Sequence, residues 1–349
     1  MHVSRWSFAL STSLLLSSPL FAQDQPTDRP LTPAPYACGA IPVCDATPPA
    51  LGPGEGFVHK APRGNPFHRG FDQLFAEGED QWVVGRFSYG NFVARGELKG
   101  ERIDIYLLRG CGTTWQKLAS VQTSEQKNQF PSVEGIDDRE GQIVFKIPDE
   151  QRLELGRHRL RLVVAGDRTA ADLYIEVLPQ GSPLFVSDVD GTLTTSEFEE
   201  LGSVIAGNKL SEANPFAASE LSQLVAKGYR PYYLTARAEN LFQRTREFLE
   251  ARQFPVGAVE TSQAGLLGLT GGKAVNFKTA AIKRLEARGF AVIGAFGNTK
   301  TDAEAYANAG IPVGQRYFYR FDDEVFGGRR IESYEQLGDF AEVADLCKP

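Results

Sequence analysis

The stretch that decides the fold is Pro183-Leu184-Phe185-Val186-Ser187-Asp188-Val189-Asp190-Gly191-Thr192. An apolar run of strand length ends at two carboxylates two positions apart, and a glycine that permits a tight turn follows them. A turn with two solvated acids is the simpler interpretation. A calcium loop would need another Asp or Asn before the glycine, so the spacing excludes it. We expect a buried strand that delivers Asp188 and Asp190 to a functional site.

The C-terminal half, residues 181–349, alternates between strand-like and helix-like segments. Strands are expected at 183–187, 232–234 and 292–296, and helices at 216–227, 239–252 and 277–288. This alternation predicts an α/β domain with a parallel sheet and helices on both faces. The active site of such a sheet lies outside the carboxyl ends of its strands, where the chain changes direction.

Three further polar clusters follow expected strands or begin helices. Thr235 and Arg237 follow the second strand and could contact phosphate, although Thr is also a routine helix cap and Arg is usually solvated. Lys278 begins a helix, where a lysine is more often a surface residue, and Lys273 is its nearest rival. The third cluster is Gly297-Asn298-Thr299-Lys300-Thr301-Asp302, in which Asn298 and Asp302 could reach one cation.

Residues 75–180 have a period of two instead. Short alternating strands separated by Gly-, Asn- and Asp-bearing turns predict an antiparallel β-sandwich of immunoglobulin-like type, a binding or supporting module with an unknown ligand. Residues 23–74 contain ten of the 20 prolines up to about residue 70 and are expected to be a linker or lead-in.

Residues 1–22 resemble a signal peptide. A weakly basic start precedes an uncharged apolar stretch that is short and serine-rich for a membrane span, so we expect export to a periplasm or the exterior; an uncleaved anchor is the alternative. The four cysteines suit an oxidising compartment, and neither a CxxC pair nor a nearby histidine supports a zinc site. Three connectivities exist, of which a local Cys38–Cys44 bond with Cys111–Cys347 is preferred.

Composition excludes several function classes. The net charge of -7 argues against nucleic acid as a partner. All four histidines precede residue 181, so the α/β domain cannot hold a Ser-His-Asp triad, a phosphohistidine or a His-rich zinc site. Cys347 is its only cysteine, and no phosphate loop follows it. The acids have to carry the chemistry.

In this order, Asp188-x-Asp190-Gly191-Thr192, Thr235, Lys278 and Gly297-Asn298-x-x-x-Asp302 resemble the four motifs of the haloacid dehalogenase-like phosphohydrolases. Over about residues 182–345, the fuller motifs resemble the lipin-like (LNS2) branch, the phosphatidate phosphatases, and this domain also occurs in membrane-associated phosphatidylinositol transfer proteins. The β-rich module resembles the immunoglobulin-like domain of lipins. Asn298 replaces the Asp of the wider superfamily, as it does in the lipin-like branch. In the place of the amphipathic N-terminal helix of lipins we expect a signal segment and a proline-rich linker, and lipins are intracellular.

The resemblance implies a Mg²⁺-dependent phosphatase. Asp188 would be the nucleophile that forms an aspartyl-phosphate, and Asp190 the general acid and base. Thr192, Thr235, Arg237 and Lys278 would contact the phosphate. The metal would be held by Asp188, Asp190, Asn298 and Asp302.

The expected substrate is a phosphate monoester, with phosphatidate first by resemblance. Only 46 residues lie between Asp188 and Thr235 and 42 between Thr235 and Lys278, so a capless domain is expected, open to a bulky or membrane-presented substrate through peripheral membrane contact. A general phosphate-scavenging phosphatase is one alternative. The other is a module that binds acidic phospholipid without hydrolysing it. Against this alternative, the residues that catalysis would need, Asp188, Asp190, Lys278 and Asp302, are all present. The sandwich could also bind a cell-surface partner.

Overall fold

The computed structural model describes residues 38, 41–42, 44–91, 94–195, 210–265 and 268–348. The predicted signal peptide, 1–22, and residues 23–37 of the proline-rich lead-in lie outside these residues, so export stays a prediction. No helix in the described ranges has the length and apolar character that a bilayer crossing requires.

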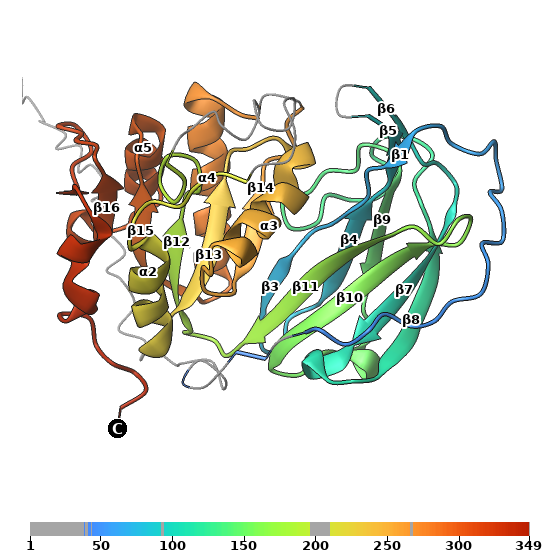
Figure 1. Ribbon diagram of the computed structural model, residues 1–349, viewed down its shortest axis with the longest axis horizontal. Coiled ribbons are helices and arrows are strands. Elements are labelled where there is room, and N and C mark those ends of the chain that lie inside the picture. The colour runs from blue at the N-terminus through green and yellow to red at the C-terminus, as the bar shows by residue number, and fades with distance from the viewer. Residues whose placement is uncertain are drawn as a thin grey trace, which may run out of the picture. The chain divides into compact units, whose positions relative to one another are not determined.

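The C-terminal half is built on a six-stranded sheet in which every neighbouring pair is parallel. Its order is β14-β13-β12-β15-β16-β17 (Figure 1). The strands are β12 (Pro183–Ser187), β13 (Arg230–Thr235), β14 (Ala258–Thr261), β15 (Ala291–Gly297), β16 (Arg316–Tyr319) and β17 (Arg329–Ile331). The first strand along the chain, β12, thus lies between the second and the fourth. The chain turns to opposite sides after β12 and β15, which is the switch point where α/β sheets bind ligands.

Helices cover both faces of this sheet because successive residues of β12 point to opposite sides. Leu184 and Val186 belong to the buried cluster that includes side chains of α4 (Gly271–Ala287) and α5 (Lys300–Asn308). Phe185 belongs to the other cluster. That cluster includes α2 (Ala217–Ala226), α3 (Phe242–Ala251) and the 3₁₀ helix η5 (Tyr334–Phe340). This confirms the predicted α/β fold class.

The N-terminal half is a β-sandwich, as predicted. The larger sheet, in the order β3-β11-β10-β7-β8, contains β3 (Gln73–Ala76), β7 (Arg102–Leu108), β8 (Trp115–Gln122), β10 (Gly156–Val164) and β11 (Ala170–Leu178). One three-stranded sheet contains β2 (Arg69–Gly70), β4 (Trp82–Arg86) and β9 (Gln142–Lys146). The other contains β1 (Asn65–Pro66), β5 (Ser88–Gly90) and β6 (Arg95–Glu97). Apolar side chains such as Phe75, Phe87, Ile105 and Leu160 fill the core.

Two details of the sandwich differ from a purely antiparallel arrangement that begins near residue 75. Strand β3 pairs with β11 in parallel. Strands β1 and β2 lie within the segment 23–74, so sheet structure begins inside the proline-rich part of the chain. The remaining 3₁₀ helices are η1 (Arg109–Cys111), η2 (Asp149–Gln151), η3 (Glu239–Leu241) and η4 (Val313–Gln315).

The preferred disulfide pairing is wrong. Cys38 is bonded to Cys347 and Cys44 to Cys111, with Cα–Cα distances of 5.2 and 4.5 Å. A local Cys38–Cys44 bond does not form because Cys44 lies beside strand β10, where its carbonyl accepts a hydrogen bond from Arg159 at 2.8 Å. The two bonds tie the lead-in to the sandwich and to the C-terminal end of the chain.

The partly buried His68 predicts a pH dependence of stability. Its ring lies against Phe87 and Tyr89, with ring centroids 5.1 and 4.9 Å away, and its Nε2 lies 2.8 Å from Thr169 Oγ1. Burial lowers the pKa of His68 to about 4, although Asp167 opposes the shift. Between a pH of about 6.5 and about 4, His68 is therefore protonated in the unfolded chain but not in the folded chain. Stability is lost as the pH falls through this window.

The free energy of unfolding is measured with urea at pH 7 and at pH 5. Between these two pH values the wild type should lose about 2 kcal/mol more of it than His68→Gln, a variant that keeps a hydrogen-bonding group. Equal losses in the two proteins would contradict a neutral His68 in the folded protein.

Candidate active site

Asp188 lies at the carboxyl end of β12, at the centre of the switch point. Its backbone N–H donates to Phe296 O on the neighbouring strand β15, at 2.9 Å. The residue is 4% exposed. Gly191 next in the loop has a φ of 67°, in the left-handed region that glycine adopts without strain. The strand and the loop together hold the Asp188 carboxylate in a fixed, largely water-free position.

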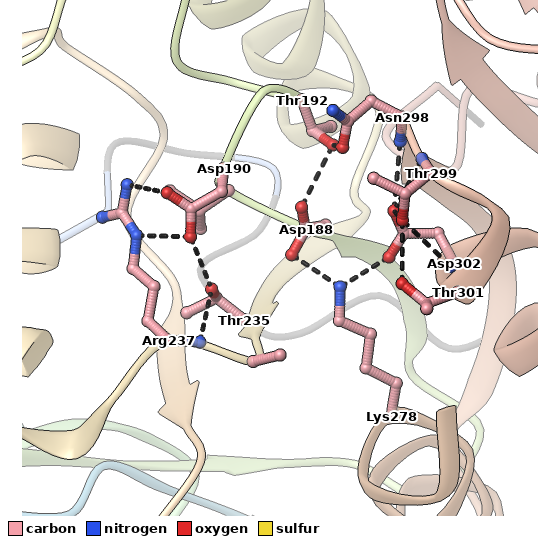
Figure 2. Close-up of polar contacts among 12 residues, drawn as sticks. Asp188, Asp190, Thr192, Thr235, Arg237, Lys278, Asn298, Thr299, Thr301 and Asp302 are labelled. Carbon is pink, nitrogen blue, oxygen red and sulfur yellow. Dashed lines mark hydrogen bonds and ion pairs between the residues drawn. The ribbon is translucent and has the colours of Figure 1, made fainter. Parts of the chain in front are cut away.

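Lys278, on the first half of α4, connects the two buried carboxylates of the site (Figure 2). Its Nζ donates to Asp188 Oδ1 at 2.7 Å and to Asp302 Oδ1 at 2.5 Å. Burial alone would lower the pKa of this lysine, but Asp188 and Asp302 hold it above its ordinary value. Lys278 is therefore an ammonium ion within the site, whereas the rival Lys273 makes no such contact.

Burial also raises the pKa of Asp188, to about 7. Lys278 counteracts this rise, while the negative charges of Asp302 and Asp190 add to it. Lys278 is shared by two carboxylates, Asp188 and Asp302, and Asp190 has its own partner in Arg237, so the three acids exceed the two cations and leave an excess of negative charge at the edge of the sheet. A cation would relieve this excess, and a phosphate dianion could not approach without one.

Asp302 is the most firmly held acid of the site. Its Oδ2 accepts hydrogen bonds from the backbone N–H groups of Asn298 and Thr299, at 3.2 and 3.0 Å, and from the Thr299 hydroxyl at 2.7 Å. Thr299 and Asp302 form the capping box that begins α5. A Cβ on Gly297 would lie 2.5 Å from the Asp302 Cβ, so only glycine fits there. The local sequence thus explains the position of the acid.

The Thr192 hydroxyl lies between two oxygens that could bind a metal. It is 3.2 Å from Asp188 Oδ2 and 2.9 Å from Asn298 Oδ1. A hydroxyl has one hydrogen and can serve only one acceptor at a time. Two oxygens converging on one hydrogen suit a hard cation such as Mg²⁺, which prefers oxygen ligands.

Three of the four predicted metal ligands, Asp188, Asn298 and Asp302, are therefore linked through the Thr192 hydroxyl and the Lys278 ammonium. Asp302 already accepts hydrogen bonds from four donors. In the described part of the chain, no group of three or more His, Cys, Asp or Glu side chains is arranged to hold a metal. A cation here would depend on the Asn298 amide oxygen and on backbone carbonyl or water oxygens, in addition to Asp188.

The Asp190 carboxylate points away from Lys278 and pairs with Arg237 (Figure 2). Arg237 donates from Nε to Asp190 Oδ2 at 2.7 Å and from Nη2 to Oδ1 at 2.5 Å, and its Nη1 donates to Thr245 Oγ1 at 3.0 Å. Thr235 Oγ1 lies 3.4 Å from Asp190 Oδ2. The structure thus brings Thr235 and Arg237 to the site, but here the guanidinium contacts the second aspartate.

Two residues that support the aspartate loop gave no usable sequence signal. Asn214 donates from Nδ2 to the carbonyls of Gly191, Thr192 and Thr194, at 3.2, 2.8 and 3.0 Å. Tyr334, in η5, donates its hydroxyl to the same Thr192 carbonyl at 2.9 Å. Asn214 precedes a proline, and this pair by itself indicates only a turn.

The sandwich contacts the segment that carries Arg237. Glu239, two residues further on, accepts from Arg69 at 2.6 Å and from Arg86 at 2.7 Å. Burial alone would raise the pKa of Glu239, but Arg69 and Arg86 hold it below its ordinary value. Two arginines of the sandwich therefore fix the position of a carboxylate beside the candidate active site.

The sheet order and the motifs at its carboxyl edge define a protein of the haloacid dehalogenase-like class. Residues 66–177 match the family model of the β-sandwich domain of PITM 1-3, and residues 185–319 match that of the LNS2 domain of PITM 1-3. The chain thus carries an LNS2 domain, the lipin-like branch of the class, and is homologous to membrane-associated phosphatidylinositol transfer proteins. This confirms the resemblance of the motifs.

Three curated relatives illustrate the homology. Membrane-associated phosphatidylinositol transfer protein 3 of Mus musculus is 28% identical over 277 residues, which cover 78% of this chain and 24% of that protein. Protein retinal degeneration B of Drosophila melanogaster is 28% identical over 250 residues, 71% of this chain and 18% of the relative. Membrane-associated phosphatidylinositol transfer protein 2 of Homo sapiens is 29% identical over 251 residues, 72% and 17%. The chain spans less than a quarter of each relative's length.

Proposed function

We propose that this protein is an exported, Mg²⁺-dependent phosphatase that hydrolyses a phosphate monoester, with phosphatidate as the expected substrate. The observation that carries the proposal is the buried Asp188, held at the switch point of the sheet between the Lys278 ammonium and the Thr192 hydroxyl. A carboxylate in this position can act as a nucleophile because little water reaches it. Export rests on the N-terminal sequence and the four cysteines.

In the proposed reaction a carboxylate oxygen of Asp188 attacks the phosphorus in line with the leaving alkoxide. Lys278 and the Thr235 hydroxyl would stabilise the transferring oxygens. Asp188, Asp190, Asn298 and Asp302 are the residues that would hold Mg²⁺, which would supply positive charge between the nucleophile and the phosphate dianion. Water then attacks the phosphorus of the aspartyl-phosphate, which releases phosphate and restores Asp188.

Asp190 has to change partners for this reaction. As the general acid it donates a proton to the leaving alkoxide, and it then accepts one from the attacking water. In the structure both carboxylate oxygens of Asp190 accept hydrogen bonds from Arg237, which occupies the group that would have to donate the proton. We therefore infer that Arg237 leaves Asp190 when substrate binds and contacts the phosphate in its place, a bidentate exchange for which guanidinium geometry is suited.

The lipid part of the proposal rests on homology and on the short intervals between the motifs. The relatives are named as phosphatidylinositol transfer proteins, which supports a phospholipid-related function for this chain. The connections between Asp188, Thr235 and Lys278 are too short to hold a large lid domain. The proposed site is therefore open to a large leaving group and to peripheral contact with a membrane.

A second candidate function is favoured by the Arg237–Asp190 pair. The pair keeps Asp190, the proposed general acid, bound to Arg237. A module that binds acidic phospholipid without hydrolysing it would not be impaired by this pairing. A general phosphate-scavenging phosphatase is the third candidate, since the same chemistry would act on soluble esters.

The experiment is phosphate release from phosphatidate in mixed micelles and from a soluble aryl phosphate, each with Mg²⁺ and with EDTA. We expect Mg²⁺-dependent release that favours phosphatidate. Release from the aryl ester alone would support the scavenging enzyme. Absence of both activities, together with Mg²⁺-independent sedimentation on phosphatidate vesicles, would support the binding module and contradict the phosphatase.

A further inference from the structure

A cavity of about 730 Å³ lies between the sandwich and the α/β half. Strands β10 and β11 form one wall, and helix α3 with the segment before β14 forms another. None of the residues assigned to the Asp188 site lines this cavity. Its volume is in the range of pockets that bind small molecules.

Two guanidinium groups lie over one aromatic ring in this cavity. Arg157 Cζ is 4.0 Å and Arg246 Cζ is 4.5 Å from the ring centroid of Tyr174. Arg157 is 7% exposed. Among the described residues, the Arg157 guanidinium makes no hydrogen bond and no ion pair. Its favourable contact at close range is the cation–π interaction with the Tyr174 ring.

The neighbouring arginines are engaged. Arg159 and Arg161, the next positions on the same side of β10, both donate to the Asp172 carboxylate, at 2.7 and 3.0 Å. Arg246 donates to the Asp172 carbonyl at 2.9 Å. Arg157 follows the same alternation along the strand and lies opposite Glu176 in the register of β10 and β11. In contrast to Arg159 and Arg161, its guanidinium forms no ion pair with a carboxylate of the described residues.

The nearby acids do not reach Arg157 because they have other partners. Asp72 accepts from the backbone N–H groups of Tyr174 and Val259, at 2.8 and 3.3 Å. Glu176 accepts from Arg230 Nη2 at 2.5 Å. Burial accordingly lowers the pKa of Arg157, although Glu176 and Asp72 oppose the shift. A buried charge of this kind is costly to the fold unless a ligand supplies its partner.

We propose that this cavity is a second binding site, for a phosphate group that pairs with Arg157 and is flanked by Arg246. A guanidinium binds phosphate through two parallel hydrogen bonds, and the Tyr174 ring holds both arginines in place beside it. The phosphate belongs to a small soluble ester or to a lipid headgroup, two sources with the same anionic chemistry. The site is independent of catalysis at Asp188.

The test compares the wild type with Arg157→Met in EDTA, by calorimetric titration with inorganic phosphate and glycerol 3-phosphate and by sedimentation on phosphatidylcholine vesicles with and without phosphatidate. We expect Arg157→Met to weaken the binding of at least one of these probes by about tenfold or more. Loss with glycerol 3-phosphate indicates a soluble ester, and loss confined to phosphatidate vesicles indicates a lipid headgroup. The same substitution should raise the melting temperature without ligand, because it removes a buried charge.

Arg161→Gln is the matched control, since it removes an arginine from the same strand but lies outside the cavity lining. It should bind every probe as the wild type does. Equal binding by Arg157→Met and wild type, or no binding of any probe by the wild type, would overturn the proposal. A lower melting temperature in Arg157→Met with unchanged binding would assign Arg157 a structural role only.

Discussion

Asp188→Asn is expected to lower the turnover of phosphatidate by at least about 10⁴-fold, because an amide oxygen does not form the aspartyl-phosphate. The substitution keeps the shape of a side chain that is 4% exposed and accepts from Lys278 and Thr192. Turnover is measured as phosphate release with Mg²⁺, and EDTA should reduce wild-type release to the level of the variant.

The fold should survive this change. Circular dichroism and the elution volume of Asp188→Asn should match those of the wild type, and Thr301→Ser is a suitable control because it keeps the hydroxyl that contacts Thr299 beside the site. Wild-type turnover by a folded Asp188→Asn would remove Asp188 as the nucleophile and with it the proposed mechanism.

Glu239→Gln is expected to destabilise the protein by about 2–3 kcal/mol, because Arg69 and Arg86 would lose the partly buried carboxylate that they share. Arg69 is 7% exposed, and burial lowers its pKa although Glu239 opposes the shift. Arg86 keeps a second acid, Glu97, at 2.8 Å. The loss should appear as a lower midpoint of urea unfolding at pH 7.

Glu247→Gln is the control for this prediction. It removes the same charge from an exposed position on helix α3 and should change the stability by no more than about 0.5 kcal/mol. If Glu239→Gln were no more destabilising than Glu247→Gln, the ion pairs between the sandwich and the Arg237 segment would contribute nothing measurable. Slower turnover by folded Glu239→Gln would show that the sandwich positions the segment.

The parallel sheet could be predicted because β12 is a continuous apolar run, as expected of a strand buried on both faces. The strand bounds 183–187 agree with the structure. The clusters at Asp188, Thr235, Lys278 and Asn298 come together because parallel strands end at one edge. Helix α4 begins at Gly271, six residues before the predicted start, since its first turn has few apolar side chains. Short strands such as β16 and β17 carry no periodic signal of useful length.

Contacts between distant segments could not be predicted. The pairing of Cys38 with Cys347 depends on where the two chain ends meet, which no local pattern encodes. The Arg237–Asp190 pair was also missed, because an arginine after a strand suits a phosphate and a carboxylate equally well. Glu239 had no motif at all, and its role depends on the separate strands that carry Arg69 and Arg86.

The Cys38–Cys347 bond, with a sequence separation of 309, closes nearly the whole described chain into a covalent ring. A protease that cuts one exposed loop inside the ring, such as the one that carries Val325, opens the ring without releasing a fragment. The nicked protein would run as a single species on a denaturing gel until a reductant is added. A protein built this way can tolerate a first cut and keep the two pieces covalently joined.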